Sequence, residues 1–342
     1  QTLPLPAHRA ALMVAGRIIP IRALAAAPEA SRQRLRRWSQ AAFFAFFVLA
    51  PIFDVFRYDL PAGHAWLLGF EWHAGLDDLL CVSKVAALGA IGRIFGRVIL
   101  PVFALGGLLM WAAWRWGRLY CGWLCPHFWV VELINECMRR AGGRPTLWEP
   151  RPLPLQRADG RTIVPDRRWW LAAALLAVGC ALVWAVVTLT YVLPPAQVYG
   201  DLLAGRPSRG EGIFIAVFTG LLALEFFFAR HLFCRFACSV GVFQSLAWMA
   251  NRAALVVGFR RERGSECVAC DSACDHACPM RLRPRNIKRA MFTCTQCGLC
   301  VAACETTQRD NPRGPLLHWA NGAAARDNEA AFRAPRFERN KL

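Results

Sequence analysis

The sequence predicts an all-α membrane domain of about four transmembrane helices, followed by a small, cysteine-rich α+β domain. Of 342 residues, 56% are hydrophobic and 14 are tryptophan, and the mean hydropathy is +0.30. A soluble protein of this length is normally less apolar. The apolar residues gather in separate blocks, and eight of the 15 cysteines follow residue 260. The blocks predict membrane helices, and the cysteines predict a separate C-terminal module.

Four apolar blocks are each close to the roughly 20 residues with which a helix crosses a bilayer. They are Trp38–Phe56, Val98–Trp116, Trp169–Val192 and Ile213–Ala229, and the first and last are short. A fifth apolar stretch, Leu76–Phe95, is broken by Lys84 and Arg93. We therefore expect that stretch to be interfacial or re-entrant. The four blocks together predict an internal repeat of two-helix units.

Basic residues are distributed unevenly across the four predicted spans. Segments 1–38, 115–168 and 230–342 carry 7, 10 and 18 of the 41 Lys and Arg residues, whereas 57–97 and 193–212 carry 4 and 2. Loops rich in Lys and Arg stay in the cytoplasm, so we expect both termini and the cysteine-rich module there. Attraction to the anionic inner leaflet explains the net charge of +18 without a nucleic-acid partner. No nucleic-acid recognition motif accompanies the arginines.

Composition divides the chain into four regions. Residues 1–37 are expected to form a basic cytoplasmic leader and 38–259 the membrane domain, with the cysteine module at 260–308 and a polar, loosely ordered tail at 309–342. Arg17 and Arg22 interrupt the apolar stretch 10–27, which argues against a cleavable signal peptide.

The C-terminal cysteines have the spacing of iron–sulfur ligands. The two runs are Cys267-x2-Cys270-x3-Cys274-x3-Cys278-Pro279 and Cys294-x2-Cys297-x2-Cys300-x3-Cys304. Three closely spaced cysteines hold three corners of a 4Fe-4S cluster, and a distant fourth completes it. Exchange of the fourth ligand between the runs predicts two clusters. One is held by Cys267, Cys270, Cys274 and Cys304, and the other by Cys278, Cys294, Cys297 and Cys300.

Zinc sites and disulfides fit these cysteines less well. Four-cysteine zinc sites consist of two Cys-x2-Cys pairs separated by a longer loop. Disulfides are rare in the cytosol, where the basic residues place this module. The spacer Asp271–Ala273 is one residue longer than is common in cluster motifs, which leaves the ligand set of the first run less certain than that of the second.

An internal repeat places a second set of cysteines after the predicted spans. Gly117–Pro126 contains Cys121-x3-Cys125, and Arg230–Ser239, 113 residues later, contains Cys234-x3-Cys238. Internal repeats in membrane proteins usually surround a pseudo-twofold axis, so we expect the four thiols to converge at the cytoplasmic face. They are candidate catalytic and metal-binding residues, because soft thiolates suit copper(I), iron–sulfur or zinc. A reversible dithiol and simple hydrophobic packing are alternatives.

Several further residues allow two interpretations. Glu225 lies inside the fourth predicted span, where a carboxylate is either a proton acceptor for quinol oxidation or a group that snorkels toward the interface near Arg230. His127 and His231 flank the thiols and either ligate a metal or bond to backbone carbonyls.

The remaining candidates lie farther from the thiols. His64 and His73 are expected on the outer side, where they could serve only a periplasmic copper or haem partner. Glu132 and Glu136, one helical turn apart, are expected on the wet face of an interfacial helix.

These motifs together resemble the FixG/CcoG proteins, which are cytochrome c oxidase accessory proteins of the bacterial inner (cytoplasmic) membrane, and more distantly the NapH and NosR membrane ferredoxins. The similar segments are Asp59–Ala62, Leu68–Phe70, Cys121–Pro126, Cys234–Cys238, Phe243–Ser245 and the double cluster motif. The resemblance implies a membrane polyferredoxin linked to oxidase assembly factors and to reduction of copper(II). Ser239 departs from the family, whose second motif ends in Cys-Pro.

We therefore expect a membrane-anchored iron–sulfur protein that relays single electrons through two 4Fe-4S clusters to the paired cysteines, with copper reduced or bound there. The donor is a ferredoxin, a flavoprotein or quinol, because the chain carries no nucleotide-binding fingerprint of its own. Alternatives are a quinol dehydrogenase that relays electrons to a reductase, a non-enzymatic copper chaperone and a redox sensor.

Overall fold

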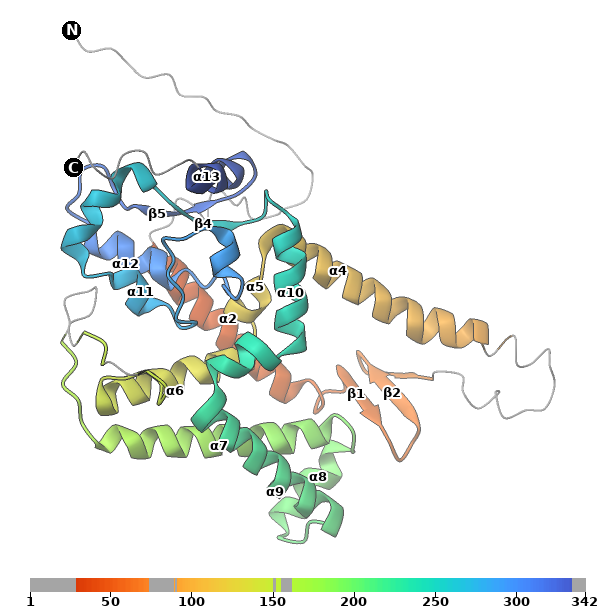
Figure 1. Ribbon diagram of the computed structural model, residues 1–342. Coiled ribbons are helices and arrows are strands. Elements are labelled where there is room, and N and C mark those ends of the chain that lie inside the picture. Colours follow the sequence, from red (N-terminus) through yellow and green to blue (C-terminus); the bar gives the residue numbers. More distant parts are fainter. Residues whose placement is uncertain (1–28, 74–88, 90, 150–151, 155–161, 334–342) are drawn as a thin grey trace.

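The computed structural model describes residues 29–73, 89, 91–149, 152–154 and 162–333. Within that part, three helical stretches are long and apolar enough to cross a membrane: Ile91–Trp116, Arg168–Thr190 and Arg209–Ala229. The first contains α4 (Leu100–Trp116), the second is α7 (Arg168–Thr190), and the third is α9 (Arg209–Leu224) extended by the π-helical turn η3 (Glu225–Ala229). Three of the four predicted blocks thus lie in apolar helices (Figure 1).

The first predicted block has a different form. Its residues 38–49 lie in helix α2 (Glu29–Leu49), and residues 50–55 form turns after that helix. Helix α2 begins within the expected leader, and its N-terminal half carries four arginines. A stripe of buried polar residues at helical spacing, Glu29, Gln33, Arg36 and Gln40, faces the rest of the protein. The leader and the membrane domain therefore share one helix, and the boundary at residue 37 falls inside it.

A small sheet stands in the segment expected on the outer side. Strands β1 (Phe56–Asp59), β2 (His64–Leu67) and β3 (Phe70–Trp72) form an antiparallel meander, so the domain is not purely helical. Leu68 and Gly69 join β2 to β3, and both have positive φ, as a tight hairpin turn requires. Of the stretch expected to be re-entrant, Ile91–Phe95 instead begin the first apolar helix. Residues 76–88 and 90 lie outside the described part.

The repeated motifs connect the apolar helices to short helices of their own. Cys121 lies in α5 (Leu119–Trp123), which leads to α6 (Pro126–Gly142), and Cys234 lies in the π-helical turn η4 (Phe233–Ala237), which leads to α10 (Ser239–Ala250). Helix α10 contacts α4, whereas α6 contacts α7. The helix that follows each motif therefore crosses to the other half of the repeat. Helix α8 (Pro195–Leu203) lies between α7 and α9.

The C-terminal module is larger than expected. Strand β4 (Val256–Phe259) pairs antiparallel with β5 (Leu317–Ala320), and α13 (Ala323–Arg333) lies beside them (Figure 1). Between these strands run the 3₁₀ helix η5 (Arg261–Cys270), α11 (Ala273–Ala277), the 3₁₀ turn η6 (Lys288–Met291) and α12 (Leu299–Thr307).

The expectation of a loosely ordered tail is therefore wrong for residues 317–333. Leu316 and Leu317 are each 1% exposed and pack beside the module's cysteines. The Asn328 side chain accepts a hydrogen bond from the Phe259 amide, and Glu329 accepts one from the Lys288 amide. Ala320 and Ala325 are buried in a second cluster of the core, so residues of the expected tail complete the core of the module.

Candidate metal centre

Four cysteines line one small cavity of the C-terminal module. Cys267 and Cys270 come from η5, Cys274 from α11 and Cys304 from α12; we call them the distal quartet. Asp271 and Ser272 have left-handed φ angles of 42° and 53°. The turn they form absorbs the extra spacer residue, so Cys274 still reaches the cavity.

The other four cysteines line a second small cavity. These are Cys278, Cys294, Cys297 and Cys300, the proximal quartet. Cys300 and Cys304 lie one turn apart on α12, so this helix joins the two quartets. The structure thus brings together the same two sets of four that crossover ligation requires.

Both quartets fit an iron–sulfur cluster better than a single ion. Zinc needs its four ligands to converge at about 2.3 Å from one point, and no group of three or more His, Cys, Asp or Glu in the described residues is close enough for that. A 4Fe-4S cluster instead takes one thiolate at each corner of a cube. Burial raises the pKa of Cys278 and Cys294 to about 12, so these thiols stay protonated unless metal displaces the proton.

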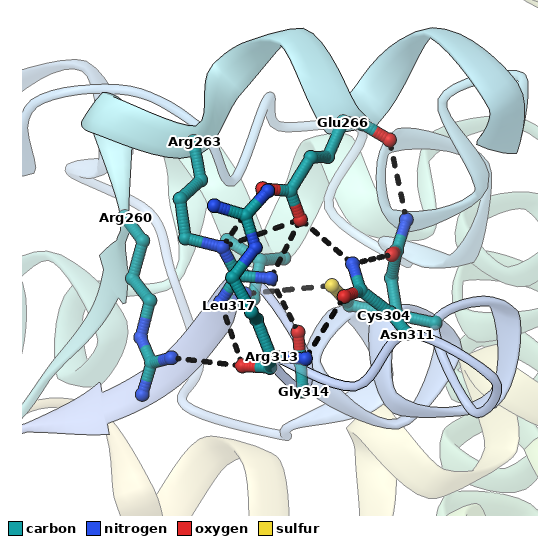
Figure 2. Close-up of polar contacts among 9 residues, drawn as sticks. Arg260, Arg263, Glu266, Cys304, Asn311, Arg313, Gly314 and Leu317 are labelled. Atoms are coloured by element: carbon teal, nitrogen blue, oxygen red, sulfur yellow. Dashed lines mark hydrogen bonds and ion pairs between the residues drawn. The ribbon is translucent and has the colours of Figure 1, made fainter.

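Backbone and side-chain donors support the quartets. The Leu317 amide donates to Cys304 Sγ at 3.4 Å, and the Leu282 amide donates to Cys278 Sγ at 3.4 Å. Figure 2 shows the polar cluster that fixes the approach to β5 beside Cys304: Glu266 accepts from Arg263 at 2.6 Å and from Asn311 at 2.7 Å. The β5 segment, expected to be part of a loose tail, therefore contributes directly to the distal quartet.

The thiol pairs, Cys121 with Cys125 and Cys234 with Cys238, lie next to the proximal quartet. Cys121 and Cys234 are buried, and Cys125 and Cys234 share an apolar cluster with Cys278 and Cys294. Burial, followed by the charge of Cys121, raises the pKa of Cys125 to about 12, and Cys238 adds to this effect. The two halves of the repeat thus bring their cysteines close together, so that the charges of Cys121 and Cys238 raise the pKa of Cys125.

The serine that replaces the expected proline leaves the local backbone unchanged. Pro126 and Ser239 each occupy the first position of the helix after a motif. The preceding residues, Cys125 and Cys238, have φ/ψ of −59°/116° and −70°/105°. Proline suits the first helical position but is not required there, and the second motif keeps its geometry without it.

Arg118 links the repeat halves, a role that the sequence did not reveal. Its side chain is buried and donates to the Cys234 carbonyl at 3.0 Å and to Cys121 Sγ at 3.7 Å. Its amide donates to Gln296 Oε1 at 2.6 Å, beside the proximal quartet. A Cβ at Gly241 would lie 2.2 Å from the guanidinium, so that glycine makes room for it.

Glu225 and His127 form a pair, which contradicts one of the two interpretations of each residue. His127 Nε2 lies 2.8 Å from Glu225 Oε2, so the carboxylate is paired with a histidine instead of snorkelling, and this ring nitrogen does not bond to a backbone carbonyl. The other ring nitrogen, Nδ1, lies 3.5 Å from Cys234 Sγ. His127 is therefore the histidine at the thiol pairs.

The other histidines lie elsewhere. His231 is buried, and its pKa falls to about 4 because of burial and the nearby charges of Arg230, Arg235 and Arg281. His64 and His73 stand on the small sheet with ring centroids 5.2 Å apart.

Glu132 lies in a buried network, so its expected place on a wet helix face is wrong. Its side chain is 15% exposed and pairs with Arg36 of α2 at 2.8 Å. Glu136 is more exposed and pairs with Arg140 one turn along α6 at 2.7 Å. The periodicity of α6 alone does not show that Glu132 is buried and Glu136 is exposed. The residue that covers Glu132 is Arg36, which comes from a helix about 100 positions earlier.

Gly122 brings the first thiol motif directly onto the proximal quartet. An added Cβ would lie 2.2 Å from the Thr295 carbonyl oxygen, far inside van der Waals contact. We expect Gly122→Ala to separate the motif from the cluster loop and to lower stability by about 1–3 kcal/mol, measured by thermal unfolding and iron content. Gly179→Ala, where nothing lies within 4 Å, is the control. Equal stability of the two variants would contradict this close contact.

A family model described as "4Fe-4S binding domain" matches residues 97–145 and 212–256. Each match contains one Cys-x3-Cys motif, so the model recognises the two halves of the repeat rather than the cysteine runs of the C-terminal module. The chain therefore carries sequence typical of iron–sulfur proteins outside those runs as well.

Several curated proteins are similar to this chain. It is 24% identical over 275 residues to the regulatory protein NosR of Stutzerimonas stutzeri, a match that covers 78% of this chain and 31% of NosR. It is 23% identical over 305 residues to the ferredoxin-type protein NapH of Escherichia coli, covering 84% and 90%. It is 25% identical over 189 residues to the putative electron transport protein YccM of E. coli, covering 55% and 48%. No solved structure matches.

The apolar helices are long enough to cross a membrane, and the chain is similar to ferredoxin-type proteins and to a 4Fe-4S binding domain. The chain spans less than half of NosR and of YccM.

Proposed function

We propose that this protein is an inner-membrane electron relay in which the two quartets hold 4Fe-4S clusters and deliver single electrons to the thiol pairs, where copper(II) is reduced. The observation that supports the proposal is the arrangement of the cysteines, in which each group lies next to the following one. Helix α12 joins the distal to the proximal quartet, and Gly122 packs the thiol motif on the proximal one. The clusters would supply one-electron storage at two successive points.

Copper is proposed as a substrate and not as a resident ion. Soft thiols suit copper(I), the product of a one-electron reduction. The described residues hold no preformed site for a single ion, and a substrate ion must enter and leave. By resemblance to the FixG/CcoG proteins, the acceptor process is cytochrome oxidase assembly, and the enzyme class is a copper reductase. The electron donor is cytoplasmic, as the distribution of basic residues predicts.

The first test of the proposal is composition. Protein purified without oxygen should contain about eight iron atoms and as many acid-labile sulfides per chain, and the reduced form should show the EPR spectrum of two interacting 4Fe-4S centres. Stoichiometric zinc without labile sulfide would exclude the relay.

A quinol donor is the second candidate, and the His127–Glu225 pair favours it. Glu225 lies near the end of the third apolar helix, and His127 lies between this carboxylate and Cys234, so a proton released from quinol could be accepted here. If quinol is the donor, Glu225→Gln should abolish cluster reduction by a quinol analogue while reduction by dithionite persists. Unchanged quinol-dependent reduction in this variant would rule out a role for Glu225.

A further inference from the structure

The ion pair between α2 and α6 stands at the junction of the proximal quartet and the first thiol motif. Arg36 is 3% exposed, and its Nη1 lies 3.0 Å and 2.8 Å from the two carboxylate oxygens of Glu132. The same nitrogen donates to the Gly122 carbonyl at 3.2 Å, and Gln40 donates to Glu132 at 3.1 Å. Both charges are thus held in fixed positions away from water.

Arg36 also reaches the proximal quartet through one side chain. Its Nε donates to Gln33 Oε1 at 2.9 Å, and Gln33 Nε2 donates to the Cys297 carbonyl at 2.8 Å. Glu132 accepts hydrogen bonds from Arg36 and from Gln40. The guanidinium is therefore one hydrogen-bonded residue away from Cys297, and the carboxylate lies on the far side of the guanidinium as the opposing charge.

Buried charges of this kind act on the reduction of a nearby group. Accepting an electron adds one negative charge, which a cation stabilises and an anion destabilises. The effect is stronger where the surroundings are poor in water, and dissolved salt screens it little. Net charge and solvent exposure are among the factors that set the potential of an iron–sulfur cluster.

We propose that Arg36 and Glu132 set the reduction potential of the cluster held by the proximal quartet, with Arg36 raising it and Glu132 restraining that rise. The proposal rests on the proposed function, since it requires a cluster at this quartet. Both are positioning residues, because neither contacts the thiol sulfurs. Their combined effect is to favour the electron on the proximal quartet, which lies next to the thiol pairs.

The test is a redox titration of the full chain, followed by EPR. Arg36→Gln should shift the potential of one cluster to a more negative value, and Glu132→Gln should shift the potential of the same cluster to a more positive value. The double variant should fall between the two. Arg37→Gln, an equal loss of charge at the exposed neighbouring position, should leave both potentials unchanged. The shifts should persist at high salt, because the pair is buried.

Opposite shifts distinguish an electrostatic role from a structural one, since general damage to the site would move both variants in one direction. Shifts of the same sign, or no shift in Glu132→Gln, would overturn the inference while leaving the relay intact. If Arg36→Gln does not fold, Arg36→Lys takes its place, and it should keep the charge and a potential close to wild type. Failure of the wild type to show any reducible cluster would instead overturn the proposed function.

Discussion

Replacing Cys297 with serine should reduce the iron content from about eight to about four atoms per chain, the loss of one 4Fe-4S cluster. Cys297 is 8% exposed and lines the cavity of the proximal quartet. Its hydroxyl replacement cannot serve as a thiolate. The EPR spectrum of the reduced variant should lose the interaction between two centres and keep the spectrum of one.

The same substitution should also lower the thermal stability of the module. The two quartets share α12, and each takes one ligand from the opposite cysteine run. Loss of the proximal cluster therefore releases the helix that holds the distal one. Cys137→Ser is the matched control, since Cys137 packs against an apolar cluster of α6 and α7 away from both quartets. Full iron content in Cys297→Ser would show that this cysteine is not a ligand.

Replacing Cys121 or Cys234 with serine should abolish copper(II) reduction while both clusters remain present and reducible by dithionite. In the proposed relay the thiol pairs are the last group to receive the electron, so their loss should stop delivery to copper without removing the two clusters. The measurement is formation of copper(I) by protein reduced beforehand, followed with a copper(I)-specific chelator. Cys137→Ser should reduce copper at the wild-type rate.

The cluster variants separate a relay from a copper chaperone. If the protein only binds copper(I), Cys297→Ser should bind it normally, because soft thiolates hold the reduced ion without an electron supply. If the protein is a relay, Cys297→Ser should lose copper(II) reduction together with the thiol variants. Equal rates of copper(II) reduction in the wild type, the thiol variants and the cluster variants would exclude copper as the substrate. Because Cys238 keeps the backbone geometry of Cys125 although Ser239 replaces proline, both halves should contribute.

Local patterns in the sequence identified the features that depend on neighbouring residues. Spacing along the sequence predicts three apolar helices, because a membrane span needs a continuous apolar stretch. It also predicts the two cysteine runs and the repeated Cys-x3-Cys motifs as ligand sites, because a cluster needs closely spaced thiols. Strand β5 cannot be predicted from local pattern, because Leu317 joins the core only when β4 pairs with it. The first block was taken as a separate span, because its hydropathy does not show that the helix starts at Glu29.

The sequence by itself determined the chemistry of this protein: cysteines in numbers and spacings for iron–sulfur ligation, and helices apolar enough for a membrane. Only the tertiary structure decided which charges act on that chemistry. Arg36 and Glu132 are about 100 residues apart and look like ordinary surface residues in sequence, yet they are buried together beside Cys297. His127 and Glu225 likewise meet only when α6 packs against the end of the third apolar helix. Removing one partner of a buried ion pair leaves the other charge uncompensated, and the fold alone fixes where the two partners meet.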